Sequence, residues 1–316
     1  GLDYLLAQMA ERDMHAVLYF NNSWEWSGGY GQYLEWAGNG RALLPSVDGY
    51  ENYVDHVSRF VKDEKAKELY YNHVKNIVTR TNTVTGKPYT EDPTIFSWQI
   101  GNEPRAFARD SVTKAAFADW MCTSASLIKS LDPNHMVSSG SEGLYGCEVD
   151  MELFEKIHAH EDFDYLNVHI WPLVWRWVTK DTFADSVCVA NRMTEKYLTV
   201  HFPVAERLGK PIVLEEFGYP RDGAKAFEGE AEKFWDGVSL SKDSSTAARD
   251  AYYSYVFGRL ISARENGEPL VGVNFWGWGG HATQSQVNEF WRPGDDYCGD
   301  PAQEPQGLFS VYATDE

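Results

Sequence analysis

Cysteine and positive charge are both scarce in this chain of 316 residues. The four cysteines, Cys122, Cys147, Cys188 and Cys298, are widely spaced and form no CxxC pair, so the sequence indicates neither a zinc site nor a disulfide framework. Lys and Arg number 28 against 47 Asp and Glu, which gives a formal net charge of -19. Nucleic acid or an anionic membrane surface would repel such a chain, whereas a neutral polysaccharide would not.

Long apolar runs are also missing, because no stretch reaches membrane-spanning length, and the sequence therefore predicts no membrane span. Aromatic residues, in contrast, are abundant, with 12 Trp and 18 Tyr. Many of these rings must lie in the core of the protein. Several Trp residues stand in polar, Gly-rich segments, where an exposed indole face could stack on the apolar face of a sugar ring.

Short apolar segments alternate with longer segments of helical pattern along the chain. The expected strands are residues 15–20, 94–101, 136–140, 165–170, 211–218 and 271–277. The expected helices are residues 50–80, 111–130, 184–208 and 245–265. This alternation predicts an α/β fold with a parallel sheet and right-handed crossovers.

The expected fold class is a (β/α)8 TIM barrel. Such a barrel needs eight strands, and the pattern supplies six. Residues 2–12 read as a helix that precedes the strand at 15–20. We therefore expect the first two βα units to be absent from this chain, and residues 1–316 to form a single catalytic domain that starts at the third unit.

Two of the expected strands each deliver a carboxylate at the C-terminal end. Glu103 follows the strand at 94–101, and Glu216 ends the strand at 211–218. In barrels and open α/β sheets this end of the strands holds the active site. Glycoside hydrolysis requires a pair of carboxylates placed in this way. The alternative is that both residues only cap strands or form ion pairs.

Glu215 and Glu216 are both candidates for the second carboxylate of this pair. Strand alternation sends neighbouring side chains to opposite faces, so only one of them can point into the barrel mouth. The spacing from Gly218 favours Glu216. His169 ends a third strand and is expected to face the same mouth, although a histidine in this place can also be a hydrogen-bonded core residue.

These motifs resemble glycoside hydrolase family 5, and more narrowly its endo-β-1,4-mannanases. The matching segments are NNSWEWSGG at 21–29, WQIGNEPR at 98–105, VHIWP at 168–172, EEFG at 215–218, FWGWGG at 275–280 and GDPAQEPQGLFSVY at 299–312. The resemblance implies that Glu103 is the acid/base and Glu216 the nucleophile of a retaining mechanism. It also implies a substrate-binding role for Asn102, Arg105, His169, Trp171, Trp276 and Trp24.

The sequence departs from the family pattern near the nucleophile. The family usually has an Arg on an early strand, and that strand lies outside this sequence. Trp171 stands where the family often has Tyr, so a hydroxyl that could bond the nucleophile is missing. Trp171 is instead expected to floor an open cleft together with Trp24 and Trp276.

The resemblance implies no metal and no organic cofactor, because two carboxylates supply both the proton and the covalent step. It implies β-mannan or mannooligosaccharides as the binding partner, a monomer, and an extracellular, periplasmic or cell-surface location. Two alternatives remain open. One is a family 5 endo-β-1,4-glucanase, because mannose and glucose differ only at C2. The other is a catalytically inactive carbohydrate-binding barrel or fragment.

Overall fold

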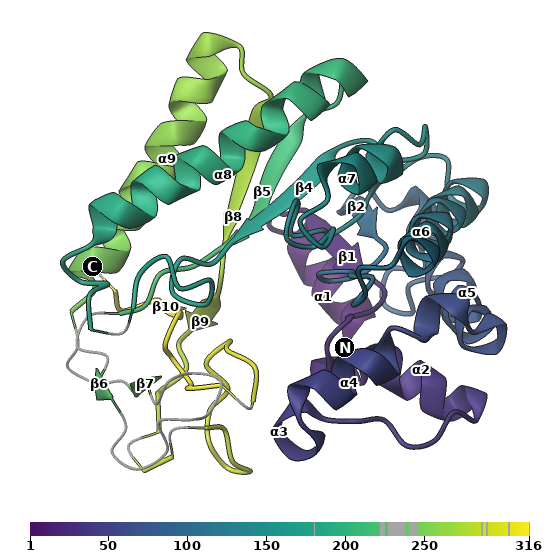
Figure 1. Cartoon of the computed structure of the whole chain (residues 1–316), viewed down its shortest axis with the longest axis horizontal. Coiled ribbons are helices and arrows are strands. Elements are labelled where there is room, and N and C mark those ends of the chain that lie inside the picture. The colour runs from purple at the N-terminus through teal and green to yellow at the C-terminus, as the bar shows by residue number, and fades with distance from the viewer. Residues whose placement is uncertain are drawn as a thin grey trace. The chain divides into compact units, whose positions relative to one another are not determined.

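The structure is a computed structural model that describes residues 1–179, 181–221, 225–226, 238–239, 245–285, 287–288, 290–302 and 304–315 (Figure 1). The chain divides into two compact units. Unit 1 comprises Gly1–Asn167 and Arg207–Pro211, and unit 2 comprises Val168–Glu206 and Ile212–Glu316. Each unit is described by itself.

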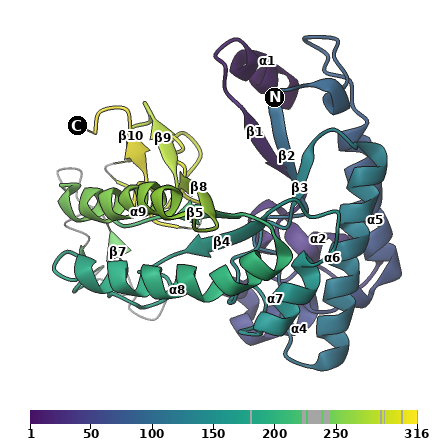
Figure 2. The ribbon, with the colours of Figure 1, turned by 90° about the horizontal axis from the view of Figure 1, so that it is seen from above.

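Unit 1 is built on a parallel three-stranded sheet in the order β1-β2-β3. Its strands are β1 (Ala16–Tyr19), β2 (Ile95–Gln99) and β3 (Met136–Ser138). The α-helices are α1 (Leu2–Ala10), α2 (Gly29–Ala37), α3 (Pro45–Asp48), α4 (Tyr50–Val57), α5 (Glu64–Val78), α6 (Ser111–Leu131) and α7 (Met151–His158), with 3-10 turns at Glu25–Ser27, Phe60–Lys62 and Tyr89–Glu91. Figure 2 shows α5, α6 and α7 side by side.

Aromatic rings fill the core of unit 1. Tyr30 stacks on Phe60 with ring centroids 4.3 Å apart, and Trp120 meets both rings edge-on. Trp98 on β2 is fully buried and donates its indole N–H to Asp132 at 2.7 Å. Much of the high aromatic content of the sequence is thus explained by packing alone.

Unit 2 contains the sheet β4-β5-β8. Its strands are β4 (Leu166–Ile170, of which the part from Val168 belongs to unit 2), β5 (Ile212–Phe217) and β8 (Leu270–Phe275), and short pairs are formed by β6 (Lys225–Ala226) with β7 (Val238–Ser239) and by β9 (Trp278–Gly280) with β10 (Val311–Tyr312). The helices α8 (Val187–Leu208) and α9 (Ala247–Asn266) lie beside each other in Figures 1 and 2. Thr194 and Tyr252 join them by a hydroxyl–hydroxyl bond of 2.8 Å.

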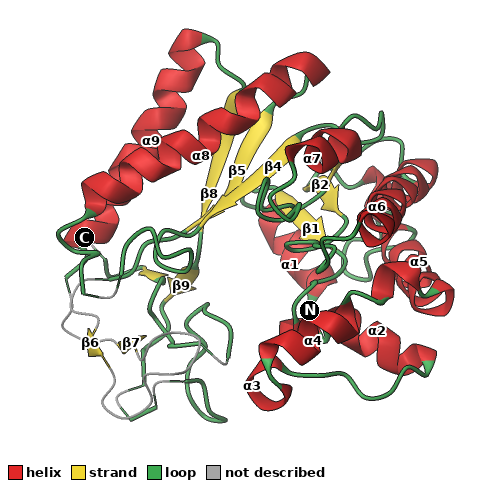
Figure 3. Cartoon of the chain, in the orientation of Figure 1, coloured by secondary structure: helices red, strands yellow, loops and turns green. Residues whose placement is uncertain are grey.

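All six expected strands are present, with ends that differ by a few residues, and they form the sheets β1-β2-β3 and β4-β5-β8. Figure 3 draws the strands in yellow. The expectation of one helix over residues 50–80 is wrong. Here α4 ends at Val57, a 3-10 turn follows, and α5 begins at Glu64. Asp63 causes the new start, because its carboxylate caps α5 by accepting from the Ala66 backbone N–H at 2.8 Å.

In the described part of the chain, no helix is both long enough and apolar enough to cross a bilayer.

Candidate active-site residues

The eight residues singled out from the sequence fall into two groups, one in each unit. Unit 1 holds Glu103, Asn102, Arg105 and Trp24, and unit 2 holds Glu216, His169, Trp171 and Trp276. In both units the residues lie at or just beyond the C-terminal ends of parallel strands. This is the end of the sheet at which α/β folds carry their binding sites.

Glu103 adopts an unusual backbone conformation four residues beyond the end of β2. Its φ angle is 50°, in the left-handed region that residues other than glycine rarely occupy. The backbone N–H donates to the Gly140 carbonyl at 3.0 Å, and the Ser23 hydroxyl donates to the Glu103 carbonyl in a short bond. A non-glycine residue held in this region marks a position where the surroundings impose the conformation.

Gly140 makes this arrangement possible. It follows β3, has a φ of +75°, and a Cβ atom there would lie 1.9 Å from the Gly101 carbonyl oxygen. No side chain fits at that distance, so only glycine lets the end of β3 approach the segment that carries Glu103. The Asn102 backbone pairs on the other side, donating to the Asn21 carbonyl at 2.7 Å. The Asn102 side chain is half-buried.

Glu103 is buried, with a relative exposure of 6%, and its carboxylate accepts a hydrogen bond from Trp24. The indole Nε1 of Trp24 lies 2.7 Å from Oε2 of Glu103. Trp24 packs edge-on against Phe107 at 5.2 Å and stacks on Trp26 at 5.9 Å. Trp24 therefore contacts the candidate acid/base directly.

Arg105 forms a bidentate ion pair with Glu142, a residue that the sequence reasoning missed. Nε and Nη2 of Arg105 donate to the two Glu142 oxygens at 2.5 and 2.6 Å. The guanidinium carbon also lies 5.2 Å from the centre of the Trp24 ring. Burial tends to lower the pKa of Arg105, but the Glu142 carboxylate outweighs it and the pKa is raised. The position of Glu142 in the sequence could have revealed it as a candidate, because it comes four residues after the end of β3.

Glu216 lies near the end of β5 and contacts two of the other candidates in unit 2. Its Oε1 accepts a hydrogen bond from Trp171 Nε1 at 3.0 Å. Its Oε2 lies 3.7 Å from Nδ1 of His169, which is 3% exposed at the end of β4. A carboxylate with a donor on one oxygen and an imidazole facing the other is held in a defined orientation.

Trp276 follows β8 and packs near Trp171, with ring centroids 6.3 Å apart. Its backbone N–H donates to the Phe217 carbonyl at 2.8 Å, and its carbonyl accepts from the Tyr253 hydroxyl at 2.9 Å. The Trp276 side chain is half-buried. The backbone of the next residue, Gly277, forms two hydrogen bonds. Its N–H donates to the Phe309 carbonyl at 3.3 Å, and its carbonyl accepts from the Val311 N–H at 2.8 Å.

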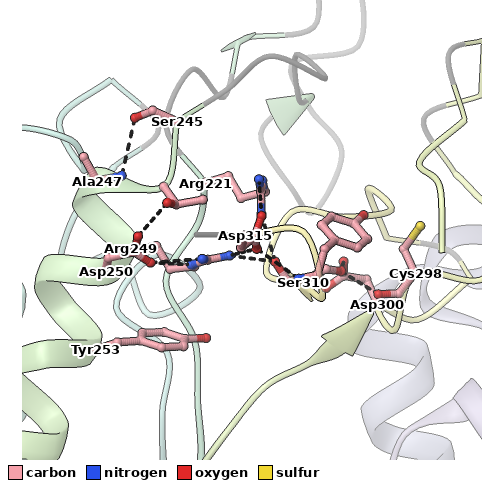
Figure 4. A network of polar contacts seen from close by, with 12 residues as sticks. Arg221, Ser245, Ala247, Arg249, Asp250, Tyr253, Cys298, Asp300, Ser310 and Asp315 are labelled. Carbon is pink, nitrogen blue, oxygen red and sulfur yellow. Dashed lines mark hydrogen bonds and ion pairs between the residues drawn. The ribbon is translucent and has the colours of Figure 1, made fainter. Parts of the chain in front are cut away.

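A polar network that the sequence reasoning also missed anchors this late segment (Figure 4). Asp315 accepts from Arg221 and Arg249, both at 2.7 Å, and Arg249 also donates to the Ser310 carbonyl at 3.0 Å. The Ser310 hydroxyl lies 3.0 Å from the buried Asp300 carboxyl. Burial raises the pKa of Asp300 to about 7. The network ties the late segment, through Ser310 and Asp315, to Arg221 and to Arg249 of α9.

A family model described as GH family 5 beta-mannosidase-like matches residues 1–316, the whole chain. The chain belongs to glycoside hydrolase family 5. It is 30% identical over 290 residues to mannan endo-1,4-beta-mannosidase 4 of rice (Oryza sativa subsp. japonica), covering 87% of this chain and 55% of that protein. It is 28% identical over 296 residues to mannan endo-1,4-beta-mannosidase 1 of Arabidopsis thaliana, covering 87% of this chain and 61% of that protein.

Two solved structures extend the comparison. The family 5 mannosidase of Rhizomucor miehei is 34% identical and gives a TM-score of 0.83 over 99% of this chain and 72% of its own. The endo-β-1,4-mannanase of Thermotoga petrophila is 25% identical, with a TM-score of 0.65 over 100% of this chain and 58% of its own. These similarities confirm the expected family and the (β/α)8-barrel fold class. The chain spans between about half and two thirds of the length of the plant relatives.

Proposed function

We propose that this chain hydrolyses internal β-1,4-mannosidic linkages of mannan, galactomannan or glucomannan, with retention of configuration. The observation that carries the proposal is Glu216, a carboxylate near the end of β5 that accepts a hydrogen bond from Trp171 and faces His169. Similarity to mannan endo-1,4-beta-mannosidases from rice and Arabidopsis supports the substrate class. We further propose that residues 1–316 act as one catalytic domain, since the mechanism needs a carboxylate from each unit.

The chemistry runs through two displacements. The Glu216 carboxylate attacks the anomeric carbon and forms a glycosyl ester, while Glu103 gives its proton to the departing glycosidic oxygen. Glu103 then removes a proton from water, whose oxygen attacks the same carbon and releases Glu216 as a carboxylate. Both steps need the two carboxyl groups about 5–5.5 Å apart, whereas inversion needs about 6.5–9.5 Å. A crystal structure with a separation of about 8 Å would contradict retention.

The remaining candidates take binding roles in this proposal. Arg105, held by Glu142, offers the outer nitrogens of its guanidinium to a sugar hydroxyl beyond the cleaved bond. Asn102 and His169 bond the sugar at the point of cleavage, and Trp276 and Trp24 offer indole surface. No metal or organic cofactor enters either displacement. We also propose a monomeric protein that works outside the cell or at its surface, as the polymeric substrate requires.

A second candidate is an exo-acting β-mannosidase, which releases single mannose residues from chain ends. The specific observation in its favour is the higher TM-score of 0.83 to the Rhizomucor miehei mannosidase, against 0.65 to the Thermotoga petrophila endo-mannanase. A mutant of the former protein was also crystallised in complex with mannosyl-fructose. Endo and exo action share the same two carboxylates and differ in how far the cleft extends.

The products of mannan hydrolysis separate these candidates. We expect the purified protein to lower the viscosity of galactomannan early and to release short mannooligosaccharides, with no effect of EDTA. Release of mannose alone would favour the exo-acting β-mannosidase. Faster cleavage of carboxymethyl cellulose than of mannan would favour the glucanase, and binding of mannan with no cleavage by the wild-type protein would favour the inactive carbohydrate-binding barrel.

Substitutions at the two adjacent glutamates test the identity of the nucleophile. Glu216→Ala should abolish turnover while leaving mannan binding largely intact, because binding is spread over several subsites. Glu215→Gln is the matched control and should retain activity, although its thermal stability can fall. Covalent labelling by an activated 2-fluoro-mannooligosaccharide, located by mass spectrometry, should fall on Glu216. A label on Glu215 would reverse the assignment.

A further inference from the structure

Trp171 contacts the candidate nucleophile through its indole nitrogen. Nε1 donates to Oε1 of Glu216 at 3.0 Å, and the whole side chain is only 8% exposed. The sequence places Trp171 where the family often has Tyr, and suggests that a donor to the nucleophile has been lost. The contact with Glu216 means that a donor is present, supplied by an N–H group in place of a hydroxyl.

The indole of Trp171 is held from several sides by residues of unit 2. The Phe309 ring meets it edge-on at 4.9 Å and the Trp276 ring at 6.3 Å. Gly218, two residues after Glu216, lies against the far edge of the indole. A Cβ atom at Gly218 would lie 2.4 Å from Cζ3 of Trp171, which is closer than any real contact. The glycine of the EEFG segment therefore leaves the space that this large ring occupies.

We propose that Trp171 is a positioning residue for the nucleophile Glu216, and that Gly218 is required because it makes room for the indole. The inference rests on the proposed function, since it assumes that Glu216 attacks the sugar. In this proposal Trp171 orients the Glu216 carboxylate, whereas the sequence suggested that its ring stacks on the substrate.

The physical reason lies in the geometry of the carboxylate. A carboxylate on a flexible side chain must present one oxygen in line with the anomeric carbon, and a misplacement of about 1 Å can cost about 10²-fold in rate. The indole N–H holds Oε1 while His169 faces Oε2 at 3.7 Å. Charge-assisted bonds of this kind also favour the ionised form, which both attacks in the first displacement and departs in the second.

Trp171→Phe is the decisive variant, because it removes the N–H and keeps an aromatic ring. We expect kcat on an aryl β-mannooligosaccharide to fall about 10- to 100-fold, with KM changed less than about twofold. The acid limb of the pH–rate profile should also move to higher pH, because an ionised carboxylate has lost a donor. Stacking on substrate predicts the reverse, namely a raised KM with kcat retained.

Trp98→Phe is the matched control. Trp98 is also buried and also donates its indole N–H to a carboxylate, Asp132, at 2.7 Å, but it lies in the core of unit 1. Its loss should lower the melting temperature by an amount similar to that of Trp171→Phe and leave kcat and the pH profile unchanged. Equal kinetic effects of the two variants would overturn the proposal.

Gly218→Ala tests whether the indole of Trp171 needs the space beside Gly218, and it does not remove the indole N–H group. In the wild-type background it should lower kcat about as much as Trp171→Phe does, because the methyl group displaces the indole. In the Trp171→Phe background it should have no further effect, since the smaller ring leaves room. Additive effects would overturn the role of Gly218. A wild-type protein inactive on every β-mannoside would refute the proposed function itself, and this inference with it.

Discussion

At the scale of single residues, the two candidate carboxylates are prepared in different ways. Glu103 is held by its backbone, in a left-handed conformation fixed by bonds to Gly140 and Ser23, and its side chain accepts from Trp24. Glu216 lies on a regular strand and is held through its side chain by Trp171. The proposed acid/base and the proposed nucleophile thus depend on different neighbours, and substitutions should separate their roles.

Glu103→Ala should slow the hydrolysis of mannan about 10²- to 10⁴-fold, because the leaving sugar hydroxyl no longer receives a proton. A 2,4-dinitrophenyl mannooligosaccharide needs no such proton, so its first displacement should survive and the glycosyl-enzyme should accumulate as a burst. Added azide should then speed turnover by attacking the ester without a general base. Glu51→Ala, on the exposed face of α4, is the control. Equal losses on both substrates, without azide rescue, would argue against the acid/base role.

At the scale of secondary structure elements, one carboxylate ties α1 to the segment that leads into β2. Asp3 of α1 accepts from Arg80 at 2.8 and 2.7 Å, from the Thr83 hydroxyl at 2.6 Å and from the Tyr89 hydroxyl at 2.5 Å. The Arg80 guanidinium, with help from Thr83 and Tyr89, holds the pKa of Asp3 well below its usual range. These bonds join residues that lie far apart in the sequence, since Arg80 is 77 positions from Asp3.

This contact predicts a pH-dependent loss of stability. Because the pKa of Asp3 is lower in the folded than in the unfolded state, its contribution is complete above an unfolded pKa of about 3.9 and declines as the pH falls below that value. Asp3→Asn should therefore lower the melting temperature at pH 7, and the difference from wild type should shrink below about pH 4. Glu11→Gln, exposed at the end of the same helix, should change little. A difference independent of pH would show that the ionised form is unimportant.

At the scale of the whole molecule, the four cysteines are free thiols in different environments. Cys147 and Cys298 are buried, Cys122 is intermediate and Cys188 is exposed. Burial raises the pKa of Cys147, Cys298 and Cys122, which disfavours the reactive thiolate in each case. The sequence argued against a disulfide framework by spacing only, whereas the structure shows all four cysteines as free thiols.

Thiol titration checks this arrangement. In the native protein, Cys188 should react with an aromatic disulfide reagent within minutes, and the buried thiols should react only after denaturation. A reducing agent should leave the melting temperature unchanged. Recovery of fewer than four thiols in denaturant without reductant, with four after reduction, would reveal a disulfide and contradict the prediction.

The sequence by itself determined the family, the six strands and the position of both candidate carboxylates. Those features are local, because an apolar run, its Gly or Pro breaker and the residue that follows can be read in one segment. The same locality explains the error over residues 50–80, where a continuous helical pattern conceals the cap at Asp63 that divides it.

Only the tertiary structure decided which side chains meet. Arg105 and Glu142 are 37 positions apart, Trp171 and Glu216 are 45 apart, and Arg221 and Asp315 are 94 apart. No periodicity or spacing signals such pairs, since each depends on how separate strand ends and loops converge in three dimensions. Trp171 shows the consequence most clearly. From the sequence, Trp171 is an aromatic surface that replaces a tyrosine hydroxyl. In the fold its indole N–H donates to Glu216, and Gly218 leaves the space for the ring.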